Sequence, residues 1–180
     1  NYRDPDTLRF YIGQSYEERK RYPEAMKWYG QVTAGDQFIP AQARYAFLLG
    51  RGNKLAEARE YLQNVKVQND DQRAQLIQAE AQLLRDAKAY QESYDLLARA
   101  LVTQPDNADL LYDSALAAEK VDRLDVVEAN LRKLIEIKPD NAQAYNALGY
   151  TLADRTARIK EAKGYVEKAL KLSPDDPFIL

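Results

Sequence analysis

Apolar residues recur at helical spacing between Pro139 and Pro174. They form two stripes, first Tyr145, Leu148 and Leu152, then Ala162, Val166 and Ala169. Residues three or four apart share one face of an α-helix, so each stripe predicts an amphipathic helix. Pro139 precedes the first helix, which Asp140 and Asn141 can cap, and Pro174 follows the second helix. The stretch therefore predicts two helices joined by a polar turn.

The same two-stripe pattern returns four times earlier in the chain. The five units begin near Asp6, Ile39, Ala74, Ala108 and Ala142, in steps of 33, 35, 34 and 34 residues. One helix pair cannot cover its own stripes, whereas stacked neighbours bury a continuous core. The pattern predicts a single domain over 1–180, with units at about 6–38, 39–73, 74–107, 108–141 and 142–176. Residues 177–180 indicate the start of a further helix, and we interpret the chain as a fragment of a longer protein.

The fifth unit has an aromatic residue, Leu-Gly, and two alanines at fixed offsets before its closing proline. In this respect it resembles the tetratricopeptide repeat (TPR), a helix-turn-helix unit of about 34 residues. The resemblance implies an all-α fold, a right-handed α-solenoid of antiparallel helix pairs with about five TPR units. In such a solenoid the first helix of each pair lines the concave face.

Local signals refine this prediction. The first unit should pair a helix over Leu8–Glu18 with one over Tyr22–Thr33. In the second unit, Gly50, Gly52 and Asn53 form the turn and tolerate positive φ, and the polar run 68–71 should cap the next helix. Small residues should let the paired helices approach closely: Gly13, Ala46, Ala81, Ala115 and Gly149.

Composition argues against catalysis. The chain contains no Cys and no His, so thiol nucleophiles, imidazole bases and the usual zinc ligands are missing. The carboxylate pairs Asp70-Asp71 and Asp175-Asp176 fall at turns between units, where capping explains them. We expect no enzyme activity, no metal and no cofactor. A net charge of −2 gives no reason to expect nucleic acid, and the lack of a long apolar run predicts no membrane insertion by this fragment.

The tyrosines divide into two groups. Six fall on motif positions and are predicted to be core residues: Tyr16, Tyr22, Tyr29, Tyr45, Tyr90 and Tyr145. Other side chains fall where the resemblance places the concave groove, at the second, fifth, sixth, ninth, twelfth and thirteenth positions of each repeat. The predicted partner-binding residues are Phe10, Gln14, Arg44, Phe47, Arg51, Gln78, Gln82, Arg85, Tyr112, Leu116, Asn146 and Tyr150. Exposed aromatics with amide side chains suit an extended peptide, although a merely solvated face with scattered aromatics is the plain alternative.

The groove positions also argue against one TPR sub-function. TPR domains that grip the acidic C-termini of heat-shock chaperones use lysines and asparagines there. Here the second and fifth positions of the five units hold no lysine. A chaperone-binding clamp of that kind is therefore not predicted.

A narrower likeness covers about 35 residues. The run 146–156, with 168–170 and 174–180, resembles the later repeats of proteobacterial outer-membrane TPR lipoproteins. That resemblance implies a bacterial periplasmic location, anchored at the outer membrane in the full-length protein; a cytoplasmic location is the alternative.

We expect a non-catalytic scaffold or adaptor that binds a partner protein or peptide in the concave TPR groove. Two alternatives stay open. The chain could be a self-assembly module that forms homo-oligomers, or the targeting domain of a larger multidomain protein.

Overall fold

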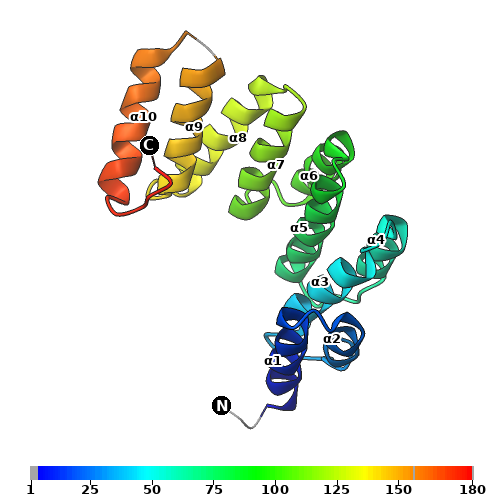
Figure 1. Ribbon diagram of the computed structural model, residues 1–180. Coiled ribbons are helices and arrows are strands. Elements are labelled where there is room, and N and C mark those ends of the chain that lie inside the picture. The colour runs from blue at the N-terminus through cyan, green and yellow to red at the C-terminus, as the bar shows by residue number, and fades with distance from the viewer. Residues whose placement is uncertain (1–3, 156, 180) are drawn as a thin grey trace. The chain divides into compact units, whose positions relative to one another are not determined.

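The computed structural model describes residues 4–155 and 157–179. These residues form ten helices and no strand (Figure 1). The helices are α1 Pro5–Glu18, α2 Tyr22–Tyr29, α3 Phe38–Leu49, α4 Leu55–Gln63, α5 Asp70–Asp86, α6 Tyr90–Thr103, α7 Ala108–Lys120, α8 Leu124–Ile137, α9 Ala142–Arg155 and α10 Ile159–Leu172. The predicted all-α fold is confirmed, and each predicted repeat contains two of these helices.

The chain divides into two compact units, Asn1–Ala89 and Tyr90–Leu180. From here on, "unit" means one of these two parts, and each of the five predicted helix pairs is called a repeat. The first unit holds α1 to α5 and the second holds α6 to α10. Within each unit, every helix packs against the next one along the chain. A single solenoid domain over 1–180, with its hand and curvature, stays a prediction.

In the first unit, close packing of α1 on α2 depends on Gly13. A Cβ atom added at Gly13 would lie 2.7 Å from the ring of Tyr29, which is closer than real Cβ atoms come. Tyr29 is fully buried and shares a core cluster with Ala25 and Val32. The predicted role of Gly13, to let the paired helices approach, is confirmed.

The second unit repeats this arrangement in its last pair, where α9 and α10 lie side by side (Figure 1). A Cβ atom at Gly149 would lie 2.8 Å from Val166 Cγ2 and 2.9 Å from the carbonyl oxygen of Ala162. Leu148 and Leu152 of α9 lie in the largest core cluster of this unit, with Leu131 of α8.

One position on the first helix of a repeat, which the sequence analysis did not single out, faces the packing with the preceding helix. This position is the third residue of a repeat. It is buried in repeats two to five, as Ala41, Leu76, Leu110 and Ala144. The equivalent residue of the first repeat is Leu8, whose surface is 49% exposed. Within each compact unit, the buried third position lies on a first helix that packs against the helix before it.

Asparagines begin three of the first helices. Asn69, Asn107 and Asn141 accept, through Oδ1, the backbone N–H groups of Gln72, Leu110 and Ala144 at 2.8, 3.1 and 3.0 Å, respectively. Each satisfies a donor that the first turn of a helix leaves unpaired. The predicted caps at 68–71 and at 140–141 are confirmed, with asparagine as the capping residue.

Three local predictions need correction. Gly52 and Asn53 adopt positive φ values of 71° and 67°, but Gly50 has φ −72° and belongs to the right-handed region. Helix α2 ends at Tyr29 rather than at Thr33, because Gly30 closes it and the Thr33 N–H donates to Asp6 instead. Residues 177–179 form a turn rather than a helix. Thr156 and Leu180, part of the narrower likeness, lie outside the described residues.

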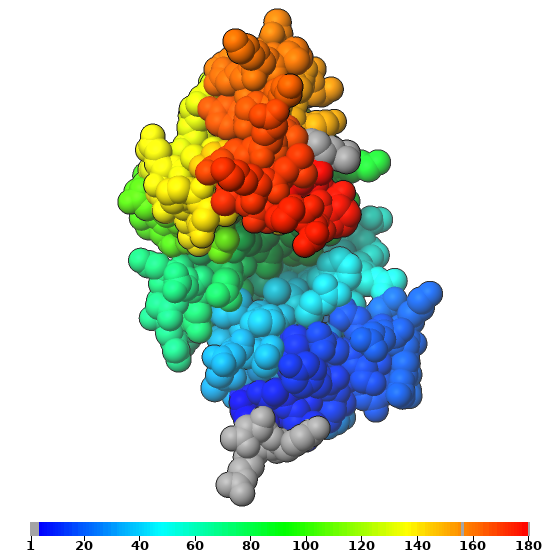
Figure 2. All heavy atoms as spheres, turned by 90° about the vertical axis from the view of Figure 1, so that its left-hand side faces the viewer, coloured from blue at the N-terminus to red at the C-terminus, as the bar shows by residue number. Residues whose placement is uncertain are grey.

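Ion pairs join α8 to α10 on the surface of the second unit. Arg132 on α8 pairs with Glu161 on α10 at 2.7 Å, and Arg158, just before α10, pairs with Glu128 on α8 at 2.9 Å. Figure 2 shows α8, in yellow, beside α10, in orange and red. Each arginine also pairs with the carboxylate on its own side, so the four side chains form a closed network.

Candidate functional site

The twelve predicted partner-binding residues all lie on or directly after the first helices of the pairs, α1, α3, α5, α7 and α9. They differ in exposure. Phe47, Arg51, Gln82 and Tyr150 are exposed, and Phe10 is buried. The half-buried ones are Gln14, Arg44, Gln78, Arg85, Tyr112, Leu116 and Asn146.

The prediction that Phe10 is exposed is wrong. Its surface is 7% exposed, and its ring centroid lies 5.7 Å from that of Tyr29. The fifth position of a repeat is half-buried where the other repeats carry Ala43, Gln78, Tyr112 and Asn146. A polar side chain there can reach outward, whereas the apolar ring of Phe10 folds into the core. The exposed aromatic of the first helix is Tyr11, at 53%.

Phe47 and Arg44, both on α3, form the best-defined part of the candidate surface. The Arg44 guanidinium lies 4.5 Å from the centre of the Phe47 ring, within cation–π range. Its Nε donates to Glu17 Oε1 on α1 at 2.9 Å, and its Nη2 donates to the same carboxylate. Glu17 also accepts a hydrogen bond from the Tyr29 hydroxyl at 2.7 Å. The exposed ring of Phe47 therefore rests on a guanidinium that two helices hold in place.

The same carboxylate perturbs both of its partners. Burial and the hydrogen bond to Glu17 raise the pKa of the Tyr29 hydroxyl well above its usual range. The hydrogen bond to Glu17 likewise raises the pKa of Arg44. Arg44 stays charged at any physiological pH, so the cation beneath Phe47 is permanent.

Sequence reasoning missed Glu17, although a signal for it existed. It occupies the twelfth position of the first repeat, a groove position, and the next repeat carries Arg44 at the sixth. Opposite charges at groove positions of successive repeats indicate an ion pair across the stack.

Other predicted residues of the first unit contact side chains of the unit itself. Arg51 lies over the ring of Tyr22, at 3.7 Å from its centroid. On α5, Gln82 donates to Asp86 at 2.7 Å and accepts from Arg85. These contacts hold several polar groups of the candidate surface in place before any partner protein binds.

In the second unit, Tyr150 is the most exposed predicted residue, at 59%. Asn146, one turn earlier on α9, donates from Nδ2 to the carbonyl oxygen of Phe178 at 3.3 Å. Tyr112 on α7 packs against the core, and burial raises the pKa of its hydroxyl. Tyr112 therefore offers less free surface than the sequence analysis predicted.

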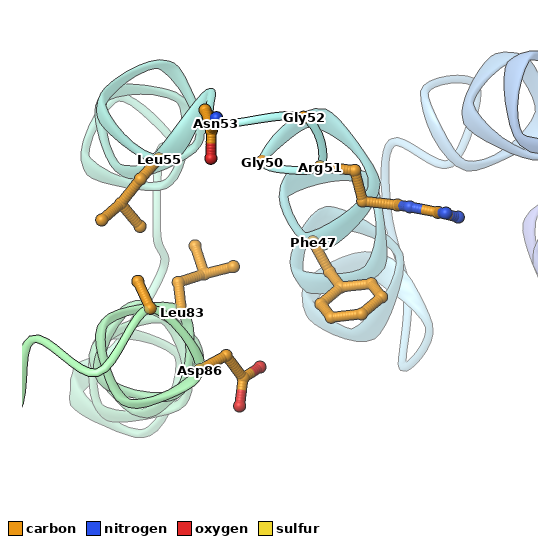
Figure 3. A pocket seen from close by; sticks show the side chains of 9 residues that line it. Phe47, Gly50, Arg51, Gly52, Asn53, Leu55, Leu83 and Asp86 are labelled. Carbon is orange, nitrogen blue, oxygen red and sulfur yellow. The ribbon is translucent and has the colours of Figure 1, made fainter.

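A hollow of about 270 Å³ lies where α3, α4 and α5 meet, within the first unit (Figure 3). Two predicted residues, Phe47 and Arg51, line it. Leu55, Leu83 and Asp86 also line it and were missed. Leu55 and Leu83 fall at repeat positions outside the predicted groove, whereas Asp86 occupies the thirteenth position, which belongs to it. The apolar ones read as core residues in the sequence.

The structure adds two findings about other kinds of site. Among residues 4–155 and 157–179, no group of three or more acidic side chains could hold a metal ion. Over the same ranges, no helix is long and apolar enough to cross a membrane.

The family model of the tetratricopeptide repeat matches residues 142–176. A curated relative, the TPR repeat-containing protein PA4667 of Pseudomonas aeruginosa, is 39% identical over 175 residues. That alignment covers 97% of this chain but 30% of the relative, so the chain spans less than a third of that protein.

Solved structures share the fold. A crystal structure of MamA matches with a TM-score of 0.64 at 20% identity, over 91% of this chain and 95% of that chain. MamA from Desulfovibrio magneticus RS-1 matches with a TM-score of 0.64 at 16% identity, over 97% and 98%. The family model at residues 142–176, the TPR-containing relative and the shared fold of helix pairs together support a tetratricopeptide repeat protein.

Proposed function

We propose that the chain is a non-catalytic scaffold that binds a partner protein or peptide through the first helices of its repeats. The observation that carries this proposal is Phe47, an aromatic side chain that stays 36% exposed while fixed over Arg44. Aromatic and arginine side chains dominate the energy of protein interfaces, since they bury large areas with little loss of freedom.

The fixed geometry favours binding. Arg44 already pairs with Glu17, so ordering the charged group costs nothing further when a partner arrives. Tyr11 and Tyr150 expose aromatic area on two other first helices. The preformed contact of Phe47, Arg44 and Glu17 within the first unit favours binding without large rearrangement.

A capture experiment tests the proposal. The chain serves as bait in bacterial periplasmic and cytosolic extracts, beside a variant with Phe47→Ala and Tyr150→Ala, one substitution in each unit. We expect a protein that the original bait retains and the variant loses. We also propose a periplasmic location, as the narrower likeness implies, and therefore expect the captured protein in the periplasmic extract rather than in the cytosolic one.

The control variant carries Val102→Ala and Ile159→Ala, which remove exposed apolar side chains from second helices. It should capture the same protein as the original chain. Equal capture by all three baits would refute binding through the first helices.

One observation favours self-assembly as a second candidate. Leu8 is 49% exposed at the repeat position that is buried in the four other repeats. This stacking face would accept either a further repeat or a second copy of the chain. Light scattering should then show an oligomer that Leu8→Glu dissociates and that Leu170→Glu, at an exposed leucine of α10, leaves intact. A monomer at every concentration would exclude this candidate.

A further inference from the structure

The hollow between α3, α4 and α5 has apolar walls contributed by three separate elements (Figure 3). Phe47 comes from α3, Leu55 from the start of α4, and Leu83 from α5. Ala87, the residue after the end of α5, lines the hollow as well. Leu83 belongs to the core cluster of this unit and is 8% exposed, so that wall is rigid. The Phe47 ring is held from outside the hollow by Arg44.

The loop between α3 and α4 forms one side of the hollow. Gly50 and Gly52 line it without side chains. A Cβ atom at Gly52 would meet nothing within 4 Å, so free space lies beside the backbone there.

Two charged residues line the hollow, Arg51 and Asp86. Asp86 lines the hollow and is exposed, and it accepts a hydrogen bond from the neutral amide of Gln82. The Arg51 guanidinium instead lies on Tyr22, and Figure 3 shows Arg51 pointing away from Leu55 and Leu83. An entering side chain therefore meets apolar walls, the neutral amide of Asn53 and one carboxylate.

Size and charge together limit the occupant. Pockets for cofactors or drug-sized ligands span about 300–1,000 Å³. A hollow of about 270 Å³ is below that range and suits one large side chain. We propose that it receives an apolar side chain of a partner protein, flanked by a lysine or arginine that pairs with Asp86. This inference rests on the proposed function, because it names the kind of segment that the scaffold recognises.

Two small probes that differ in charge test the proposal directly. The first, 2-phenylethylammonium, joins an aromatic ring to a cation, and the second, 3-phenylpropionate, joins a similar ring to a carboxylate. Each is titrated into the isotope-labelled chain at millimolar concentration and followed by NMR at the Leu55 and Leu83 methyls and the Gly52 amide. We expect the methyl and amide resonances to shift when 2-phenylethylammonium is added. Its affinity for the chain should be about two- to fivefold higher than that of 3-phenylpropionate, because one exposed ion pair contributes about that much.

Three variants make the result specific. Asp86→Asn should abolish the preference for the cation while leaving ring binding. Ala87→Phe should fill the hollow and abolish the shifts, since Ala87 is exposed and can accept a larger side chain without disturbing the core. Ala56→Phe places the same ring at an exposed position of α4 that does not line the hollow, and should bind the cation like the original chain.

Each contrary outcome is distinct. Shifts elsewhere in the chain, or no shifts, would overturn the hollow as a binding site. Equal binding of both probes, or a preference that survives Asp86→Asn, would overturn the basic partner segment. The probe titration does not depend on partner capture. The hollow can therefore fail as a binding site while the scaffold function stands, and the scaffold function can fail while the hollow still binds the probe.

Discussion

Four residues that are not glycine adopt the left-handed backbone conformation at the same place in their repeats. Lys20, Asn53, Lys88 and Asp122 are each the fifteenth residue of their repeat, with φ values of 60°, 67°, 59° and 58°. At three of them the next residue closes the helix end by donating five residues back, as Ala89 does to Leu84 at 2.8 Å. This is the hydrogen-bond pattern in which helix ends usually place glycine.

Lys88→Gly should therefore raise the free energy of unfolding by about 0.5–1 kcal/mol. A left-handed L-residue costs roughly 1–2 kcal/mol, and glycine removes this cost. Glycine also has more freedom in the unfolded chain, which cancels part of the stabilisation. Urea denaturation measures the change. Lys168→Gly, inside α10, is the control and should lower stability by about 1 kcal/mol. A loss of stability in both variants would contradict this explanation of the turns.

At the residue scale, the sequence predicted positions better than exposures. The repeat register placed two helices in each repeat, and it located the caps at 68–71 and 140–141 and the close approach at Gly13 and Gly149. It could not show that Phe10 turns inward, because burial at a half-exposed position depends on which neighbouring side chain leaves room. It also could not show the hollow beside Phe47, which forms only when three helix ends meet.

At the scale of elements, a buried carboxylate fastens α5 to α4. Glu80 is 4% exposed, and it accepts from Arg59 Nε at 2.9 Å and from Gln63 Nε2 at 2.7 Å. It occupies the seventh position of its repeat, where the fifth repeat carries the buried Leu148. Burying a charge costs free energy unless partners compensate for it, so this junction depends on α4 supplying both donors.

Removing the carboxylate alone should be costly. Glu80→Ala should lower the free energy of unfolding by about 2–4 kcal/mol, because it leaves a cavity and a partly buried guanidinium without its carboxylate. Replacing both partners, with Glu80→Leu and Arg59→Leu, should restore most of the loss. A double-mutant cycle by urea denaturation checks the coupling. Additive losses would show that the two side chains act independently.

At the scale of the whole molecule, stability should be flat around neutral pH and fall at both extremes. Hydrogen bonds from Arg132, then from Arg158, lower the pKa of Glu128 and of Glu161. A lowered carboxyl pKa stabilises the fold above the unfolded value of 4.5, and this contribution disappears as the pH falls through the folded pKa. Burial raises the pKa of Tyr61 from 10.0 to about 12, so its contribution is present below pH 10.0 and disappears as the pH rises.

Because the chain contains no histidine, no imidazole titrates between these limits. Urea midpoints should agree between about pH 6 and pH 9, and fall near about pH 3.5 and about pH 11. Tyr61→Phe should reduce the alkaline loss and leave the acid loss unchanged. A step in stability between about pH 6 and pH 8 would contradict this assignment.

The pairing of Glu80 with α4 has a consequence for how such a chain can change in evolution. If the second repeat were deleted in register, Glu80 would face α2, where Met26 and Gly30 stand at the places of Arg59 and Gln63. Neither can donate a side-chain hydrogen bond, so the shortened protein would bury an uncompensated charge. The repeats look alike in their pattern, yet they are not interchangeable. The order of the second and third repeats is encoded in the chemistry of the junction between them.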